Sequence, residues 1–303
     1  MSTFIILQQM AVIAFMMLTG FCLRKSGRID GQFTKQLSFT IANITNPALM
    51  ISAASDPEAV TTRSELLTGF LLAAGLYAVL CVMGFILPVV LGIPKAERKF
   101  YNMMTVYTNT GFMGIPLAQV ILPESAMIYV IIVNAMFNIY IYTHGVLVLG
   151  GREHISLMRL VSPGFLGSVA AVAIRWFGIV LPLVPGNIAD YLGNSTTFLA
   201  MILLGSSVSQ LSLKESMRDI HMWLFLAGSM LAVPAVITAG LRAAGANQDL
   251  TMAFSLMVAM PAGNLSLILA EKEGYPTETL ARGILMTTLV SFFTVTLLLG
   301  LLF

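Results

Sequence analysis

Apolar stretches long enough to cross a bilayer alternate with short polar breaks along the chain. A helix needs about 20 mostly apolar residues to cross a hydrocarbon core of about 30 Å. Ten stretches meet this requirement, and they lie near 4–23, 33–54, 66–91, 101–121, 126–149, 162–182, 191–210, 221–241, 250–270 and 280–302. The pattern therefore predicts an all-α integral membrane protein with ten transmembrane helices.

The composition excludes several other classes of protein. Apolar residues make up 57% of the 303 residues and charged residues only 10%, whereas soluble domains have about 25% charged residues. So few charges exclude a soluble enzyme, and so much apolar surface excludes disorder. A net charge of +2 leaves no basic face for nucleic acid. Cys22 and Cys81 both lie inside apolar stretches, so we expect no disulfide framework, metal site or cofactor.

The basic residues are distributed unevenly between the two sides of the predicted membrane. Thirteen of the 16 Lys and Arg residues follow odd-numbered spans, and the other three are Arg63, Arg175 and Arg242. Cytoplasmic loops carry the excess of Lys and Arg. We therefore expect a multi-pass protein of the cell membrane, inner or plasma, with both termini outside.

A polar break in the middle of the chain divides it into two halves. The break, GGREHISLMRL, leaves five predicted spans on each side. Because five is odd, two halves with the same fold would sit in the membrane in opposite orientations, as in many transporters. The predicted organisation is a first inverted repeat at 1–150, a cytoplasmic linker at 151–160 and a second repeat at 161–303.

The fourth span of each half is the one most interrupted by glycine and proline. The two segments are TNTGFMGIPLAQ (108–119) and AMPAGNLSLILA (259–270). Proline has no N–H, so Pro116 and Pro261 are expected to release backbone carbonyls from the helix. Half-helix N-termini in such interruptions attract anions, and paired interruptions mark transporter binding sites.

Neutral polar side chains near the interruptions are the candidate ligand groups, because they donate to a carboxylate without burying a charge. At the two interruptions the candidates are Asn109, Thr110, Gly111, Gly114, Pro116, Pro261, Gly263, Asn264 and Ser266. The second span adds Asn43, Asn46 and Pro47, for which a packing kink is an equal alternative. For Asn134 and Asn138 on the fifth span, hydrogen bonding between helices is at least as good an explanation as a binding role.

Acidic residues are absent from the predicted site. Thirteen of the 14 Asp and Glu residues lie in loops or at helix ends. The remaining one, Glu271, is about 15 Å along the helix from Pro261. Without a carboxylate to neutralise sodium, we expect sodium-independent transport. His144 lies well inside a span and is the candidate for proton coupling.

Other classes of function have weaker support. His144 and the serines of GSSVS (205–209) suggest an intramembrane serine hydrolase, but the Gly-x-Ser-Gly pattern of such a protease is missing. An anion channel would need a ring of charges or a repeated filter sequence, and neither is present. Arg175, which precedes Trp176, is predicted to anchor a helix end at the interface; attraction of anions to the outer mouth is the alternative.

Four motifs carry a resemblance to a known family over the whole chain. They are GFCLRKSGRID, NITNPALM, NTGFMGIPLA and MPAGNLSLILAEKEG. In this order they resemble the auxin efflux carrier family, and the missing long central loop makes a short-loop bacterial permease more similar than the large plant carriers. The resemblance implies a fold like that of the bile-acid/sodium symporters, in which broken helices 4 and 9 cross.

The resemblance also implies a mechanism and a class of substrate. Spans 1, 2, 6 and 7 would form a scaffold, and spans 3–5 and 8–10 a transport core that moves as an elevator. The substrates would be small organic anions, either auxin-like or malate- and malonate-like. Partners would be the lipid bilayer and a second copy of the chain bound through the scaffold helices. The residues that match the two crossing motifs are Asn109, Gly111, Gly114, Pro116, Pro261, Gly263 and Asn264.

Overall fold

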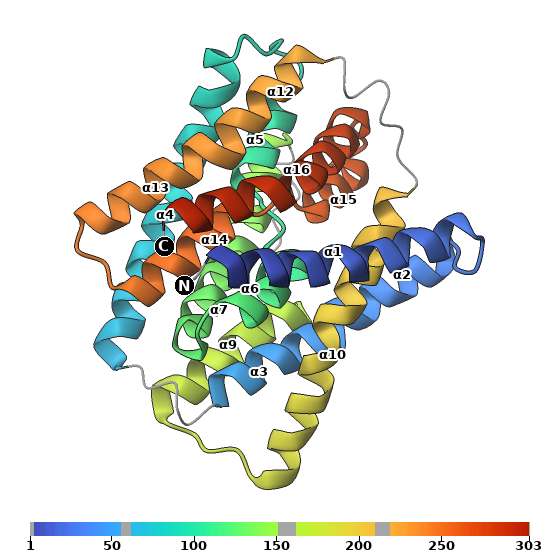
Figure 1. Ribbon diagram of the computed structural model, residues 1–303. Coiled ribbons are helices and arrows are strands. Elements are labelled where there is room, and N and C mark those ends of the chain that lie inside the picture. Colours follow the sequence, from blue (N-terminus) through green and yellow to red (C-terminus); the bar gives the residue numbers. More distant parts are fainter. Residues whose placement is uncertain (1–2, 56–61, 151–161, 210–218, 303) are drawn as a thin grey trace.

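The computed structural model describes residues 3–55, 62–150, 162–209 and 219–302, which form helices joined by short turns (Figure 1). The first half contains α1 (Thr3–Lys25), α2 (Gly31–Thr40), α3 (Asn46–Ser55), α4 (Arg63–Val90), α5 (Arg98–Val106), α6 (Ile115–Ile121), α7 (Glu124–Tyr140) and α8 (Val146–Val148). The second half contains α9 (Pro163–Phe177), α10 (Leu183–Val208), α12 (Ile220–Ala227), α13 (Val233–Ala243), α14 (Gln248–Ala259), α15 (Asn264–Lys272) and α16 (Glu278–Leu302). The prediction of an all-α protein is confirmed.

Several helical stretches have the properties of membrane spans. Among the described residues, four are long and apolar enough to cross a bilayer: Arg63–Val90, Glu124–Val148, Ile220–Ala243 and Glu278–Gly300. Shorter apolar helices cover Thr110–Ile121 and Pro163–Phe177. Large apolar side chains on α4, such as Leu71 and Val90, are more than 70% exposed, as expected for a surface that faces lipid. The chain is a multi-pass membrane protein, while the number of spans and the inverted repeat remain predictions.

Helix starts follow from capping residues in the sequence. The Thr62 side chain accepts from the Glu65 N–H, and the Glu65 carboxylate accepts from the Thr62 N–H, which forms a capping box at the start of α4. Asn247 caps α14 and Ser162 caps α9 in the simpler way, through a side-chain oxygen.

Three helices widen into a π-turn just before a proline. The turns Ile41–Thr45, Thr110–Gly114 and Gly228–Ala232 end two residues before Pro47, Pro116 and Pro234, respectively. Proline cannot donate to the helix, and its ring clashes with the carbonyl of the preceding turn. The wider turn removes that clash and lets the helix continue. Pro116 therefore lies within one continuous helical stretch, Thr110–Ile121.

The helices form two groups. α1 packs against α10, and α3 packs against both α9 and α10. In the other group α4 packs against α5 and α7, and α14 packs against α7, α13 and α16. In Figure 1, α1 runs across the middle of the molecule toward α2 at the right, α3 lies below α1, α10 extends downward past it, and α12 and α13 lie above it. The contacts of α7 with α3 and α9 join the two groups.

Glycine allows α1 and α10 to approach very closely. A Cβ atom at Gly20 would overlap the Ile202 carbonyl, and one at Gly205 would overlap the Met17 carbonyl. Small residues at helix contacts are typical of membrane proteins, because close backbone packing replaces the hydrophobic driving force available in water.

Candidate functional site

The two interrupted helices meet at their breaks. Asn109 N–H donates to Pro261 O at 2.7 Å, and Gly263 N–H donates to Tyr107 O at 2.8 Å. These bonds pair Thr108 with Ala262 as an isolated antiparallel bridge. We call the paired segments 107–109 and 261–263 the crossover. The crossover brings together residues from the two halves of the chain that the sequence had singled out.

Side chains satisfy other polar groups that the breaks would leave unpaired. The Thr108 hydroxyl donates to Met257 O at 2.8 Å, near the end of α14. Ala262 N–H donates to the Thr287 hydroxyl of α16 at 3.1 Å. Non-helical backbone at membrane depth requires such partners or contact with water. The crossover is therefore held by its own backbone and by two neighbouring helices.

The position of the first break differs from the sequence expectation. Pro116 was expected to release carbonyls at the interruption, but α5 ends at Val106 and the break lies at 107–109. Pro116 lies in α6 behind its π-turn. Pro116 does not interrupt the helix because the π-turn before it accommodates the proline ring. Pro261, by contrast, lies in the second break itself.

Gly263 is required by the close approach of the two breaks. A Cβ atom there would lie 3.0 Å from both Tyr107 O and Thr108 O. Since backbone oxygens cannot move aside as a flexible side chain can, any larger residue would push the two segments apart.

A cavity of about 530 Å³ opens beside the crossover, and we call it the crossover cavity. Its walls come from α2, α3, α7, the start of α9, α15 and both breaks. Six asparagines line it: Asn43, Asn46, Asn109, Asn134, Asn138 and Asn264. Thr110, Gly111 and Gly263 from the predicted site also line it. No Asp or Glu is among its lining residues within the described part of the chain.

Two of these asparagines have side-chain atoms without a protein partner. Asn109 Oδ1 accepts from Phe112 N–H at 3.2 Å, while its buried Nδ2 donates to no described residue. Asn46 Nδ2 donates to Gly111 O at 2.9 Å, while its buried Oδ1 accepts from none of the described groups. The two residues are only 4% and 5% exposed. A buried polar atom without a partner costs free energy, and a substrate that reached these atoms would remove that cost. Each atom has almost no exposed surface in this conformation.

The neighbouring asparagines of α7 are used in structural bonds. Thr110 Oγ1 donates to Asn134 Oδ1 at 2.9 Å, and Asn134 Nδ2 donates to Ser168 Oγ at 3.3 Å. Asn138 Nδ2 donates to Asn134 O at 2.8 Å. Asn43 Nδ2 likewise donates to Phe39 O at 2.7 Å. These bonds support the alternative that the sequence left open for Asn134 and Asn138.

Asn264 begins α15 at the edge of the crossover cavity. Gly263 precedes it as the helix N-cap and has no side chain to cap with. The N–H groups of the first helical turn have no carbonyl of a preceding turn to bind, and both Asn264 and Leu265 line the cavity. This helix end therefore offers N–H donors and a partial positive charge to the cavity.

Two lysines that the sequence did not identify as site residues also line the crossover cavity. They are Lys35 of α2 and Lys272 at the end of α15. Both are exposed, and neither forms a salt bridge with the described residues. Each is eight residues from a lining asparagine, Asn43 or Asn264, which is about 12 Å along a helix. That spacing is the signal that sequence reasoning missed.

The remaining predicted residues lie outside the cavity lining. Pro47 packs on Gly167, where a Cβ atom would be 2.8 Å away, and Gly114 packs on Met257. Ser266 Oγ points to Met103 O at 3.5 Å. Pro116 is buried within α6, and Pro261 contributes its carbonyl to the crossover. Their contribution to the site is to shape the backbone around it.

His144 also lies outside the cavity lining. Its Nδ1 is 2.7 Å from the Tyr107 hydroxyl, and its ring meets Phe85 edge-on. The serines of the hydrolase alternative bond elsewhere: Ser206 to Thr34 and Ser207 to Leu203 O. Within the described residues His144 is therefore not hydrogen-bonded to a serine.

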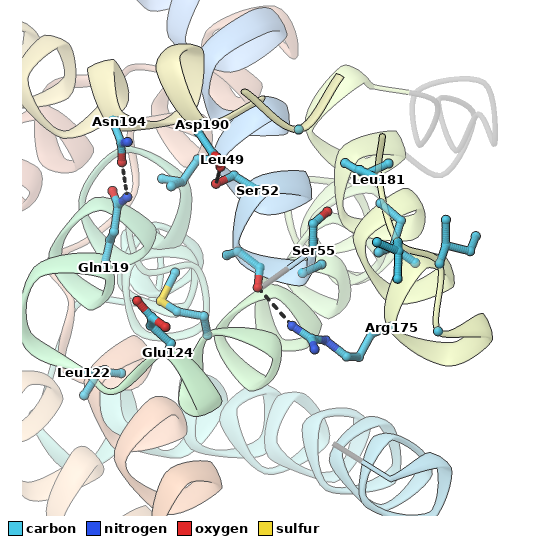
Figure 2. Close-up of a pocket in the computed structure, with 18 residues that line it drawn as sticks. Leu49, Ser52, Ser55, Gln119, Leu122, Glu124, Arg175, Leu181, Asp190 and Asn194 are labelled. Carbon is cyan, nitrogen blue, oxygen red and sulfur yellow. Dashed lines mark hydrogen bonds between the residues drawn. The ribbon is translucent and has the colours of Figure 1, made fainter. Parts of the chain in front are cut away.

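A second cavity, of about 880 Å³, lies at the opposite ends of α7 and α9, and we call it the far cavity. Figure 2 shows Arg175 directed toward a backbone carbonyl, that of Ala53, at 3.2 Å. It also shows Gln119 Nε2 donating to Asn194 Oδ1 at 2.9 Å. Glu124 and Asp190 line the same cavity. The far cavity thus carries both signs of charge, unlike the crossover cavity.

Buried side chains separate the two cavities. Adjacent residues of α3 face different sides, since Leu49 lines the far cavity and Met50 the crossover cavity. Both are 1% exposed or less. The Thr110–Asn134–Ser168 bonds lie beside Met50, which accepts from Ser168 Oγ at 3.3 Å.

The protein combines helices that are long enough to cross a membrane with a polar cavity where two broken helices meet. This combination is typical of integral membrane transporters. A family model described as membrane transport protein matches residues 5–158 and again residues 153–299. The chain belongs to this family, which confirms the resemblance to auxin efflux carriers. The same model matches once in each half, in agreement with a repeat. None of the curated proteins compared with the chain matches it.

Proposed function

We propose that the protein carries small organic anions, with a carboxylate as the recognised group, across the cell membrane. The observation that carries this proposal is the chemistry of the crossover cavity. Among the described residues, its lining combines unpartnered amide groups and two lysines with no carboxylate. Such a lining favours an anion over a cation or a neutral solute. Membership of a transporter family supports transport over binding alone.

The substrate carboxylate would bind at the inner end of the cavity. Asn109 Nδ2 is a buried donor without a described partner, and a carboxylate oxygen would accept its proton. The Asn264 side-chain amide and the first N–H groups of α15, at Asn264 and Leu265, would donate to the same carboxylate. Asn46 Oδ1 would accept from a substrate hydroxyl. Auxin-like acids and malate- or malonate-like acids both have a carboxylate for this position.

The transport cycle we propose is elevator-type alternating access by ten spans in two inverted repeats. Matches of one family model to 5–158 and 153–299 support the repeat, and the odd number of predicted spans in each supports the inversion. The packing of α1, α3, α9 and α10 on one another supports a scaffold distinct from the core. Two cavities at opposite ends of α7 and α9 support access from alternate sides.

We further propose that both termini lie outside and that two copies associate through the scaffold helices. The bias of the basic residues supports the orientation. Exposed apolar side chains on α10, such as Leu183 and Tyr191, offer surface for lipid or for a second copy. The substrate gradient and the membrane potential would drive transport without sodium, since no carboxylate lines the crossover cavity among the described residues.

The test is uptake into proteoliposomes by the purified full chain. The panel contains malonate, malate, butyrate and indole-3-acetate, with glucose and lysine as neutral and cationic controls. We expect saturable uptake of at least one carboxylate and of neither control. Uptake of no carboxylate, or uptake of lysine alone, would overturn the proposal. A cleaved product in place of the intact acid would favour the hydrolase alternative.

A further inference from the structure

Tyr107 connects the crossover to the end of α7. Its carbonyl accepts from Gly263 N–H at 2.8 Å within the crossover. Its buried hydroxyl donates to Tyr140 O at 2.9 Å and contacts His144 Nδ1 at 2.7 Å. The tyrosine ring packs on Gly145, where a Cβ atom would lie 3.2 Å away. One residue is therefore bonded at its backbone to the crossover and at its side chain to the segment that contains His144.

That segment is a π-turn without a proline. The turn Ile141–Gly145 is followed by Val146 and Leu147, whereas the π-turns before Pro47, Pro116 and Pro234 have a proline as their cause. A side chain inserted into the backbone ladder is another cause of such a turn. Here two hydroxyls bind the Tyr140 carbonyl immediately before the turn, that of Tyr107 at 2.9 Å and that of Thr143 at 3.3 Å. The Tyr107 hydroxyl comes from outside the helix, so it is the group that can act as the insertion.

One arrangement of protons satisfies both hydrogen bonds of the Tyr107 hydroxyl when His144 is neutral. A hydroxyl has one proton, and the Tyr140 carbonyl can only accept. Both contacts of the Tyr107 hydroxyl are satisfied when its proton goes to Tyr140 O and His144 Nδ1–H donates to the hydroxyl oxygen. His144 Nε2 then carries a lone pair. This atom is buried and has no partner among the described residues.

A second proton on the ring would have no hydrogen-bond partner among the described residues. Protonation adds an N–H and a positive charge at Nε2, where no described acceptor is present. The titratable groups that face this pair are Tyr77 and Cys81 of α4 and Tyr140 of α7, and Phe85 covers the other side of His144. None of them is an acid that would neutralise the charge. A protonated ring that turns toward water to solvate this N–H breaks its bond to Tyr107.

We propose that neutral His144 is a positioning residue that holds the crossover through Tyr107, and that its protonation releases this hold. The inference rests on the proposed function, because the crossover is where the substrate carboxylate binds. Acidification weakens substrate binding, since Asn109 and Asn264 lose a fixed geometry when Tyr107 is released. Tyr142, two residues before His144, lines the crossover cavity and moves with the same turn.

The variant His144→Gln separates protonation from position. The glutamine amide N–H donates to the Tyr107 hydroxyl as neutral His144 does, but it takes up no proton in this range. Tyr107→Phe removes the hydroxyl and leaves His144 in place. His221→Gln is the matched control, because His221 is an exposed histidine whose partner is Asp219. Substrate protonation is common to all four proteins and cancels in the comparison.

Two measurements between pH 5.5 and 7.5 test the inference. Malonate affinity in proteoliposomes should fall from pH 7.5 to pH 5.5 in both proteins because the substrate is protonated. The wild type should lose about threefold to tenfold more affinity than His144→Gln, as expected for one lost hydrogen bond. Thermal unfolding without ligand should show the same pattern, with a Tm that falls on acidification in the wild type and in His221→Gln but not in His144→Gln. Tyr107→Phe should bind malonate more weakly than His144→Gln at every pH.

Wild-type and His144→Gln proteins with parallel pH profiles in both measurements would overturn the inference while leaving the carrier intact. Failure of the proposed function looks different, because the wild type would then take up no carboxylate at any pH. A Tm difference without an affinity difference would contradict the role of His144 in positioning the site.

Discussion

Asn109 donates its backbone N–H to Pro261 O across a distance of 2.7 Å, although 152 positions separate the two residues in the chain. The bond joins the two halves where the helix of each is interrupted. It also fixes the Asn109 side chain at the wall of a cavity, with Nδ2 buried and without a described partner. Structure and proposed function depend on this contact.

The close packing of the crossover predicts a large effect from a small substitution. Gly263→Ala places a Cβ atom 3.0 Å from two carbonyl oxygens, so we expect a loss of about 1–3 kcal/mol in the free energy of unfolding. Gly75→Ala is the control, because a Cβ atom there meets nothing within 4 Å. It should be neutral or stabilising by up to about 1 kcal/mol. Thermal unfolding in detergent measures both; equal Tm values would contradict the packing argument.

The two lysines of the crossover cavity predict a dependence on substrate charge. Lys35→Gln and Lys272→Gln should each weaken binding of malonate by about threefold to tenfold and that of butyrate by less, since the attraction grows with ligand charge. Added salt should reduce the difference. Lys95→Gln is the control, because this exposed lysine does not line the cavity. Equal losses for the two acids would show that the lysines do not recognise charge.

The distribution of basic residues predicts the topology. In a variant without Cys22 and Cys81, single cysteines placed near residues 2 and 303 should react with a membrane-impermeant thiol reagent added outside. A cysteine near residue 154 should be protected in intact cells. Protection of either terminus, or labelling at 154, would contradict the ten-span arrangement.

None of the described residues that line the crossover cavity is acidic, and this predicts independence from sodium. Replacement of sodium by choline at fixed membrane potential should leave uptake into proteoliposomes nearly unchanged. A fall of about tenfold or more would contradict this prediction and would indicate a sodium site built from neutral oxygens.

Much of the fold could be predicted because its determinants are local. Apolar stretches and their capping residues, such as Thr62 with Glu65, act within a few positions and placed helices in the predicted ranges. The location of the first break could not be read from Pro116, because a π-turn absorbs that proline. A single sequence does not distinguish a proline that ends a helix from one that follows a wider turn.

The candidate site could be predicted in part for a similar reason. Asn109 and Asn264 were identified because each lies next to an interruption in its own helix. Lys35 and Lys272 were missed, because their eight-residue spacing from Asn43 and Asn264 becomes meaningful only when helices from opposite halves of the chain pack around one cavity. The contact between Tyr107 and His144 likewise links positions 37 residues apart, and no local pattern marks it.

The affinity of the Asn109→Ala and Asn264→Ala variants for a transported carboxylate tests the central claim most directly. Each substitution removes a donor to a charged group, worth about 1.5–3 kcal/mol, so affinity should fall by about one to two orders of magnitude. Asn102→Ala is the control, because Asn102 is buried on α5 but lies outside the cavity lining; it should keep wild-type affinity. If both cavity variants fold and bind as tightly as the wild type, the amides at the crossover do not hold the substrate.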